Sequence, residues 1–158
     1  MARNIFEKVS LLKPSAMATV AERRFDDAET LSQTGENARA NGVAYLAGFV
    51  VEILLKARLV DKYPTIARKR QHEVLEHEHE IWRLIWRQHD LALMLDRMRE
   101  LQAALRTRGE RDGNNYLSEL TKVCARWTIH ARYSPHAMQM DEARQWLERV
   151  RLLKDVLK

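Results

Sequence analysis

The stretch from Val43 to Val60 reads VAYLAGFVVEILLKARLV and decides the fold. Between Val43 and Leu55, only Gly48 and Glu52 are not apolar. A helix that is apolar on almost every face has to be enclosed by other elements or by lipid. A bilayer core requires about 17–25 apolar residues, and this run is shorter and contains a carboxylate. The stretch therefore predicts the central buried helix of a soluble bundle that has no membrane span.

Two residues interrupt this apolar run. Glu52 is its one charged side chain before Lys56, and burying a carboxylate without a partner is costly. We expect Glu52 to pair with Lys56 one turn later or with an Arg from another helix; a carboxylate of a functional site is the alternative. Gly48 lacks a side chain, so we expect a neighbouring backbone to approach the helix closely there.

The composition favours one helical domain over residues 1–158. Five Gly and three Pro leave few turns for β-hairpins. The net charge is +5, with 19 Arg against 8 Lys. This balance suits nucleic acid or an acidic protein as a partner, and a solvated Arg-rich surface is the alternative. Cys124 is the single cysteine, which excludes an internal disulfide and fits a cytoplasmic location. Its apolar neighbours predict a core position.

Apolar residues recur at helical spacing through the rest of the chain. They predict an all-α, up-and-down bundle of about five to six helices. The expected segments are a helix over 15–33 with Ser15 as N-cap, the central helix, an inserted helix near 65–88, a helix that starts after Asp90 as N-cap, a helix from Tyr116 to about Ser134, and a last helix with Asp141 as N-cap.

Two segments are candidates for contact with a second subunit. Apolar residues between Val74 and Trp86 repeat near every seven positions, which is typical of a helix that pairs with another helix. The first fourteen residues, which end at Pro14, form a short apolar segment that we interpret as a small helix or an arm packing on a partner.

The stretch from His72 to Glu80 is rich in His and Glu, as metal sites are. Zinc-protease helices place two His four residues apart so that both face the metal. Here His72 and His77 are five apart, and His77 and His79 point to different faces of a helix. We therefore expect no metal site and interpret the cluster as a solvated charged face.

A short basic patch, formed by Lys62 with Arg68, Lys69 and Arg70, lies just before this cluster. Such a patch can bind phosphates. No aromatic residue alternates with these cations to stack on bases, so the patch does not indicate recognition of a nucleotide sequence.

A second polar group follows one side of the helix predicted from Tyr116. At about 100° per residue, its members fall within one lateral stripe. A cation, an imidazole and a phenol one turn apart can hold a phosphodiester and move a proton. The alternative is a polar flank beside a helix–helix contact. The residues of this stripe are Glu119, Lys122, Arg126, His130 and Tyr133.

Three segments of the chain resemble the HEPN superfamily (higher eukaryotes and prokaryotes nucleotide-binding). Residues 22–31 (ERRFDDAETL) resemble its first helix. Residues 42–56 (GVAYLAGFVVEILLK) resemble its second, an apolar helix that ends in Glu-x-x-Leu-Lys. His89-Asp-Leu91, followed by Leu95, resembles the start of the third. Together with the last two predicted helices the resemblance covers most of the domain, and 65–88 corresponds to an insertion.

The resemblance implies an up-and-down helical bundle, often a homodimer, that needs no metal or other cofactor. Many members are ribonucleases of toxin–antitoxin or phage-defence systems, with Arg followed after four to six residues by His. In this chain Arg126 and His130 have only three residues between them, as do Arg132 and His136. The segment 127–133 instead resembles HEPN-like chains with a Trp-x4-Arg-Tyr ending, for which nuclease activity is not implied.

These observations lead to two hypotheses. In the first, a bacterial stress or defence protein engages RNA or nucleotide, and His130 acts as general acid/base while Arg126 stabilises the phosphorane and Tyr133 orients it. Phosphate contacts would come from Lys122, Arg132, Arg68, Lys69 and Arg70. In the second, the chain is a non-catalytic binding or oligomerisation module for a partner such as a minimal nucleotidyltransferase.

Overall fold

The computed structural model describes residues 13–134 and 138–158, apart from the side chains of Arg132 and Tyr133. The described residues form helices and no strand, so the all-α prediction is confirmed. None of the described helices is long and apolar enough to cross a membrane. The α-helices are α1 (Pro14–Gln33), α2 (Ala40–Lys62), α3 (Pro64–Arg68), α4 (His79–Trp86), α5 (Leu91–Asp96), α6 (Arg99–Asp112), α7 (Tyr116–Arg126) and α8 (Met140–Leu157); short 3₁₀ helices are η1 (Asn37–Arg39), η2 (Gln71–Glu73), η3 (Glu76–Glu78) and η4 (Ile129–Tyr133).

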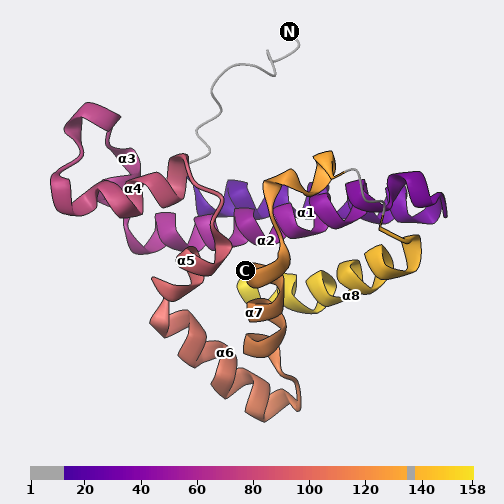
Figure 1. Ribbon diagram of the computed structural model, residues 1–158. Coiled ribbons are helices and arrows are strands. Elements are labelled where there is room, and N and C mark those ends of the chain that lie inside the picture. Colours follow the sequence, from indigo (N-terminus) through magenta and orange to yellow (C-terminus); the bar gives the residue numbers. More distant parts are fainter. Residues whose placement is uncertain (1–12, 135–137) are drawn as a thin grey trace, which may run out of the picture.

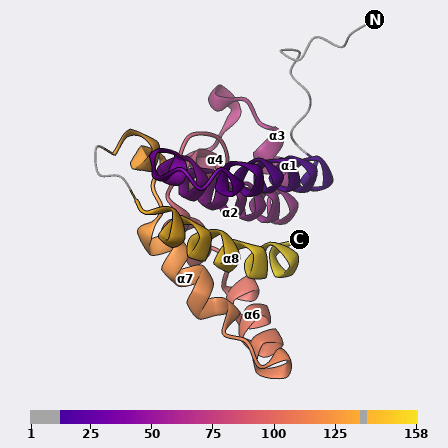
Figure 2. The same cartoon turned by 90° about the vertical axis from the view of Figure 1, so that its right-hand side faces the viewer.

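Helix α2 is the centre of the bundle, as its sequence predicts. Helix α1 lies along one side of it and α8 runs along another (Figures 1 and 2). Helices α3 and α4 lie at one end of α2. Helices α6 and α7 lie below the pair formed by α1 and α2 in the view of Figure 1. Most side chains of α2 are therefore buried, including Val43, Val50, Leu54, Leu55 and Leu59. Because neighbouring elements cover most of the surface of α2, its apolar run needs no lipid.

The single inserted helix predicted near 65–88 is wrong, because this segment forms two short helices, α3 and α4, joined by 3₁₀ turns. Glutamate side chains interrupt the helix because they accept backbone N–H groups: Glu73 from Arg70 at 2.7 Å and Glu78 from Leu75 at 2.9 Å. Two tryptophans of α4 then hold the segment against the end of α3. Trp82 Nε1 donates to the carbonyl of Lys69 at 2.9 Å, and Trp86 Nε1 donates to that of Ala67 at 3.2 Å.

The stripe from Val74 to Trp86 packs mainly within the chain itself. Trp82 and Ile85 are buried, whereas Leu75 is 54% and Trp86 39% exposed. Contact of Leu75 and Trp86 with a second subunit therefore stays a prediction. The N-terminal arm, residues 1–12, lies outside the described residues.

Three predicted N-caps had different outcomes. Asp90 caps α5, since its side chain accepts the N–H of Leu93 at 2.9 Å. Ser15 does not cap α1, because the helix already begins at Pro14, which has no backbone N–H and so needs no acceptor. Asp141 does not cap α8 either: the N-cap is Gln139, whose N–H donates to Glu142 at 3.2 Å, and Asp141 lies in the first turn.

Candidate functional site

The predicted stripe on one long helix is wrong, because α7 ends at Arg126. Trp127 has an extended backbone (φ −79°, ψ 140°), and His130 lies on the separate helix η4. The side chain of Thr128 accepts the N–H of His130 at 3.3 Å and so starts η4. His130 therefore does not follow Arg126 by one turn of the same helix. The side chains of Arg132 and Tyr133, which we predicted to assist them, lie outside the described part of the chain.

Tertiary packing of Trp127 explains why α7 stops there. Its indole is buried against Gly48 of α2: a Cβ added to Gly48 would lie 1.8 Å from Trp127 Cδ1. Trp127 Nε1 donates to the carbonyl of Tyr45 at 3.2 Å, and the two rings stack with centroids 6.0 Å apart. A close approach at Gly48 is confirmed, but the predicted approaching group was wrong: it is the side chain of Trp127 and not a backbone.

The first half of the stripe forms an ion-pair cluster between α7 and α8. Glu119 accepts hydrogen bonds from Lys122, at 2.5 Å, and from Arg149 of α8. The hydrogen bond from Lys122, followed by that from Arg149, holds the pKa of the Glu119 carboxyl below its usual value. Lys122, predicted to bind phosphate, thus already has a carboxylate partner. Around Glu119 the stripe has the character of a polar flank at a helix–helix contact.

Arg126 lies differently, at a cleft of about 290 Å³ between α7, η4 and the first half of α8. The cleft is also lined by Trp127, Trp146, Glu142 and Arg149. The guanidinium of Arg149 lies over the ring of Trp146, 5.6 Å from its centroid. Arg126 is exposed and has no ion-pair partner among the described residues. Sequence reasoning missed Arg149, because it lies on a different helix from Arg126 and nothing in their spacing connects them.

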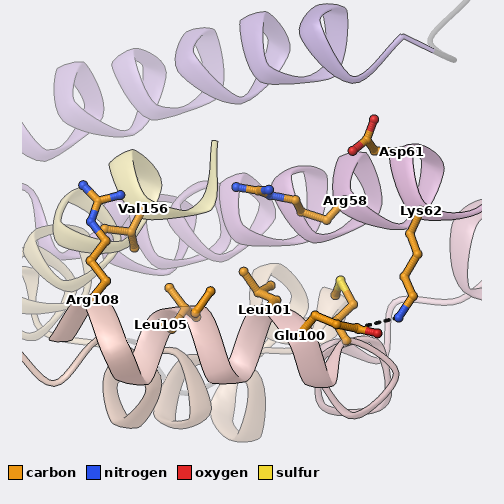
Figure 3. A pocket seen from close by; sticks show the side chains of 10 residues that line it. Arg58, Asp61, Lys62, Glu100, Leu101, Leu105, Arg108 and Val156 are labelled. Carbon is orange, nitrogen blue, oxygen red and sulfur yellow. Dashed lines mark hydrogen bonds and ion pairs between the residues drawn. The ribbon is translucent and has the colours of Figure 1, made fainter. Parts of the chain in front are cut away.

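In the second predicted phosphate site, the basic patch, two of the four cations are paired with acidic side chains. Lys62 Nζ is 2.6 Å from Glu100, as Figure 3 shows, at the mouth of a cleft of about 400 Å³ between α2 and α6. This hydrogen bond raises the pKa of Lys62. Lys69 pairs with Glu78 at 2.5 Å. In the part of the chain that the structure describes, only Arg68 and Arg70 of this patch lack an ion pair, and both are exposed.

The His- and Glu-rich stretch contains η2, η3 and the start of α4. Within residues 13–134 and 138–158, no group of three or more His, Cys, Asp or Glu side chains is placed to hold a metal ion. One glutamate of the stretch, Glu78, instead binds Lys69 and the backbone of Leu75. Cys124 is buried as predicted, and its burial raises the pKa of the thiol to about 12.

A third polar group surrounds Glu52, whose predicted ion pair with Lys56 is confirmed at 2.7 Å. The same carboxylate oxygen, Oε1, also lies 2.8 Å from Nδ1 of His89. Sequence reasoning missed this contact because 37 residues separate the two side chains. The contact joins the Glu-x-x-Leu-Lys and His-Asp-Leu segments, two of the three segments that resemble the HEPN superfamily.

Comparisons of the chain with protein-family models, with curated proteins and with solved structures found no match.

Proposed function

We propose that this protein binds RNA or nucleotide phosphate in the cleft between α7 and α8, as a HEPN-like module of a bacterial stress or defence system. The observation that carries the proposal is the convergence of Arg126 and Arg149 on one cleft with two tryptophan rings in its walls. Arg is suited to phosphate because its planar fork donates two parallel hydrogen bonds. Contact between Glu52 and His89 supports the HEPN part, since it joins the two resembling segments.

Charges around the cleft favour an anionic ligand. The charged residues that line it are two cations, Arg126 and Arg149, and one carboxylate, Glu142, which leaves a net charge of 2 − 1 = +1. Arg149 already pairs with Glu119 outside the lining, and Glu142 accepts a backbone N–H of the α8 cap. The guanidinium of Arg126 is therefore the group most available to a phosphate.

We propose binding without cleavage as the basal activity. A general acid/base has to lie within hydrogen-bond reach of the reacting group. The break at Trp127 moves His130 to η4, and His130 is not among the residues that line the cleft. Catalysis by His130 with Arg126, Arg132 and Tyr133 stays a prediction that the same experiment examines.

The test compares two arginines that both lack an ion pair among the described residues. Arg126→Ala removes a cation from the cleft, and Arg106→Ala removes one from the exposed side of α6 as a matched control. Fluorescence anisotropy with a labelled single-stranded RNA gives the affinity at several salt concentrations. We expect Arg126→Ala to weaken binding about tenfold and to lower the salt slope by about 0.7, with Arg106→Ala close to wild type.

Two results would oppose this proposal. Equal weakening by both substitutions would mean that binding follows the net charge alone, and no salt-dependent binding by the wild type would remove the RNA function. The same samples, run on a denaturing gel, reveal cleavage. Cutting that disappears in His130→Ala would replace the binding-only proposal with the nuclease hypothesis.

The second candidate function is docking of a protein partner, either a second copy of the chain or a nucleotidyltransferase. The observation that favours it is the exposure of Leu75 and Trp86, two large apolar side chains of the inserted segment. Leu75→Ser with Trp86→Ser should reduce the mass seen by light scattering if this segment joins two copies. An unchanged mass, or a monomeric wild type, would exclude a homodimer formed through these residues.

A further inference from the structure

A pocket separate from the α7–α8 cleft lies between α1, α2 and the end of α4. Its volume is about 310 Å³, within the range of small-molecule sites. Most of its lining is apolar and includes Met17, Val20, Phe49, Ile53 and Trp86. Its polar groups are Glu52, Lys56 and His89, which form the cluster described above.

Glu52 gives this pocket an unusual feature. Its side chain is only 1% exposed, and both of its described partners, Lys56 and His89, bind the same oxygen, Oε1. The second oxygen, Oε2, is buried and has no hydrogen-bond partner among the described residues. A buried carboxylate oxygen without a donor is destabilising, so such groups usually have a partner in the working protein. Glu52 is itself one of the residues that line the pocket, so a ligand bound there would lie beside this oxygen.

The charges around Oε2 restrict what that donor can be. An anion would meet the Glu52 carboxylate, and a second cation would meet the ammonium of Lys56, which already neutralises the carboxylate. A neutral N–H or O–H group has neither problem. The remaining walls provide two aromatic rings, Phe49 and Trp86, and the thioether of Met17, which favour an aromatic body.

We infer that this pocket binds a small neutral aromatic molecule of the indole or phenol class, with its single N–H or O–H group donating to Glu52 Oε2. The apolar walls supply the affinity by burying the ring, and Glu52 supplies the selectivity by requiring a donor. Lys56 and His89 act as positioning residues, because both hold Oε1 and leave Oε2 without a donor among the described residues. This site does not depend on the RNA-binding cleft.

The test varies the ligand first, because substitutions at Glu52 would also break its ion pair and could unfold the protein. Indole and 1-methylindole are titrated into the full ¹⁵N-labelled chain and followed by NMR. The methyl group of 1-methylindole removes the N–H donor and adds apolar surface. If the hydrogen bond to Glu52 decides affinity, indole binds more tightly; if apolar burial alone decides it, 1-methylindole does. We expect indole to bind at least tenfold more tightly, with shifts confined to the residues around Glu52. Equal or tighter binding of 1-methylindole would refute the donor, and no saturable binding of indole would mean that water alone satisfies Oε2.

A second measurement locates the site. Val20→Phe adds a ring to the apolar wall without touching Glu52, whereas Leu152→Phe adds the same ring at an exposed position of α8. Both variants are checked for a folded amide spectrum. Indole binding should be lost in Val20→Phe and kept in Leu152→Phe. Wild-type affinity in a folded Val20→Phe variant would show that indole binds elsewhere and would overturn the proposal.

Discussion

Gly48→Ala should destabilise the protein even though alanine is the better helix former. An alanine inside α2 gains about 1 kcal/mol in helix propensity. Its Cβ, however, would lie 1.8 Å from Cδ1 and 2.2 Å from Nε1 of Trp127, far inside van der Waals contact. The indole is a rigid ring whose N–H is bound to the carbonyl of Tyr45, so it has to leave its position as a whole.

The size of the effect follows from what the displaced ring loses. Removing a buried tryptophan from its site costs about 3–5 kcal/mol, and partial repacking around an added group costs about 1–3 kcal/mol. Because the ring has to leave as a whole, the larger cost applies, and after subtracting the gain in helix propensity we expect Gly48→Ala to lower the free energy of unfolding by about 2–4 kcal/mol. For a chain of this length that corresponds to a fall in Tm of about 4–16 °C.

Urea denaturation followed by far-UV circular dichroism measures this change. Gly42→Ala, also in α2, is the matched control, because its added Cβ meets only the mobile end of Leu31 at 3.0 Å. We expect this control to be neutral or slightly stabilising. In a Trp127→Leu background the clash is absent, so adding Gly48→Ala should then stabilise by up to about 1 kcal/mol. A Gly48→Ala variant as stable as the wild type would refute the packing of Trp127 against α2.

Glu52→Ala leaves the ammonium of Lys56, which is 13% exposed, without its carboxylate, so the free energy of unfolding in urea should fall by about 3–5 kcal/mol. Glu52→Leu combined with Lys56→Met should recover most of that loss, and an equally unstable double variant would contradict the ion-pair explanation. The hydrogen bond from Lys158 lowers the pKa of the Glu22 carboxyl from 4.5, so this stabilisation is complete above the unfolded-state pKa and disappears as the pH falls through the lower folded-state pKa. Glu22→Gln should therefore be less stable than the wild type at pH 7 but not at pH 2. A stability difference that persists in acid would show that the ionised Glu22 carboxylate is not its cause. Since burial raises the pKa of the Cys124 thiol to about 12, a thiol reagent at pH 8 should label it only as fast as the protein opens; immediate labelling of the native protein would contradict this burial.

Local signals in the sequence identified the elements that depend on neighbours along the chain. The apolar run around Leu54 predicted the buried helix α2, and Asp90 marked the start of α5. The ion pair between Glu52 and Lys56 was also predictable, because residues four apart meet on one face of a helix. Each of these inferences needs only a helical period or the chemistry of a cap.

Contacts between distant segments decided the rest. The segment after Arg126 keeps a helical pattern in sequence, yet it leaves the helix because burying the indole of Trp127 in the space beside Gly48 contributes more than another helical turn. His89 reaches Glu52 across 37 residues, a separation at which no periodicity operates. The sequence alone thus determined which residues are apolar, helical or charged. Only the tertiary structure decided which of them meet, because the burial that selects one partner over another exists only once the helices have packed.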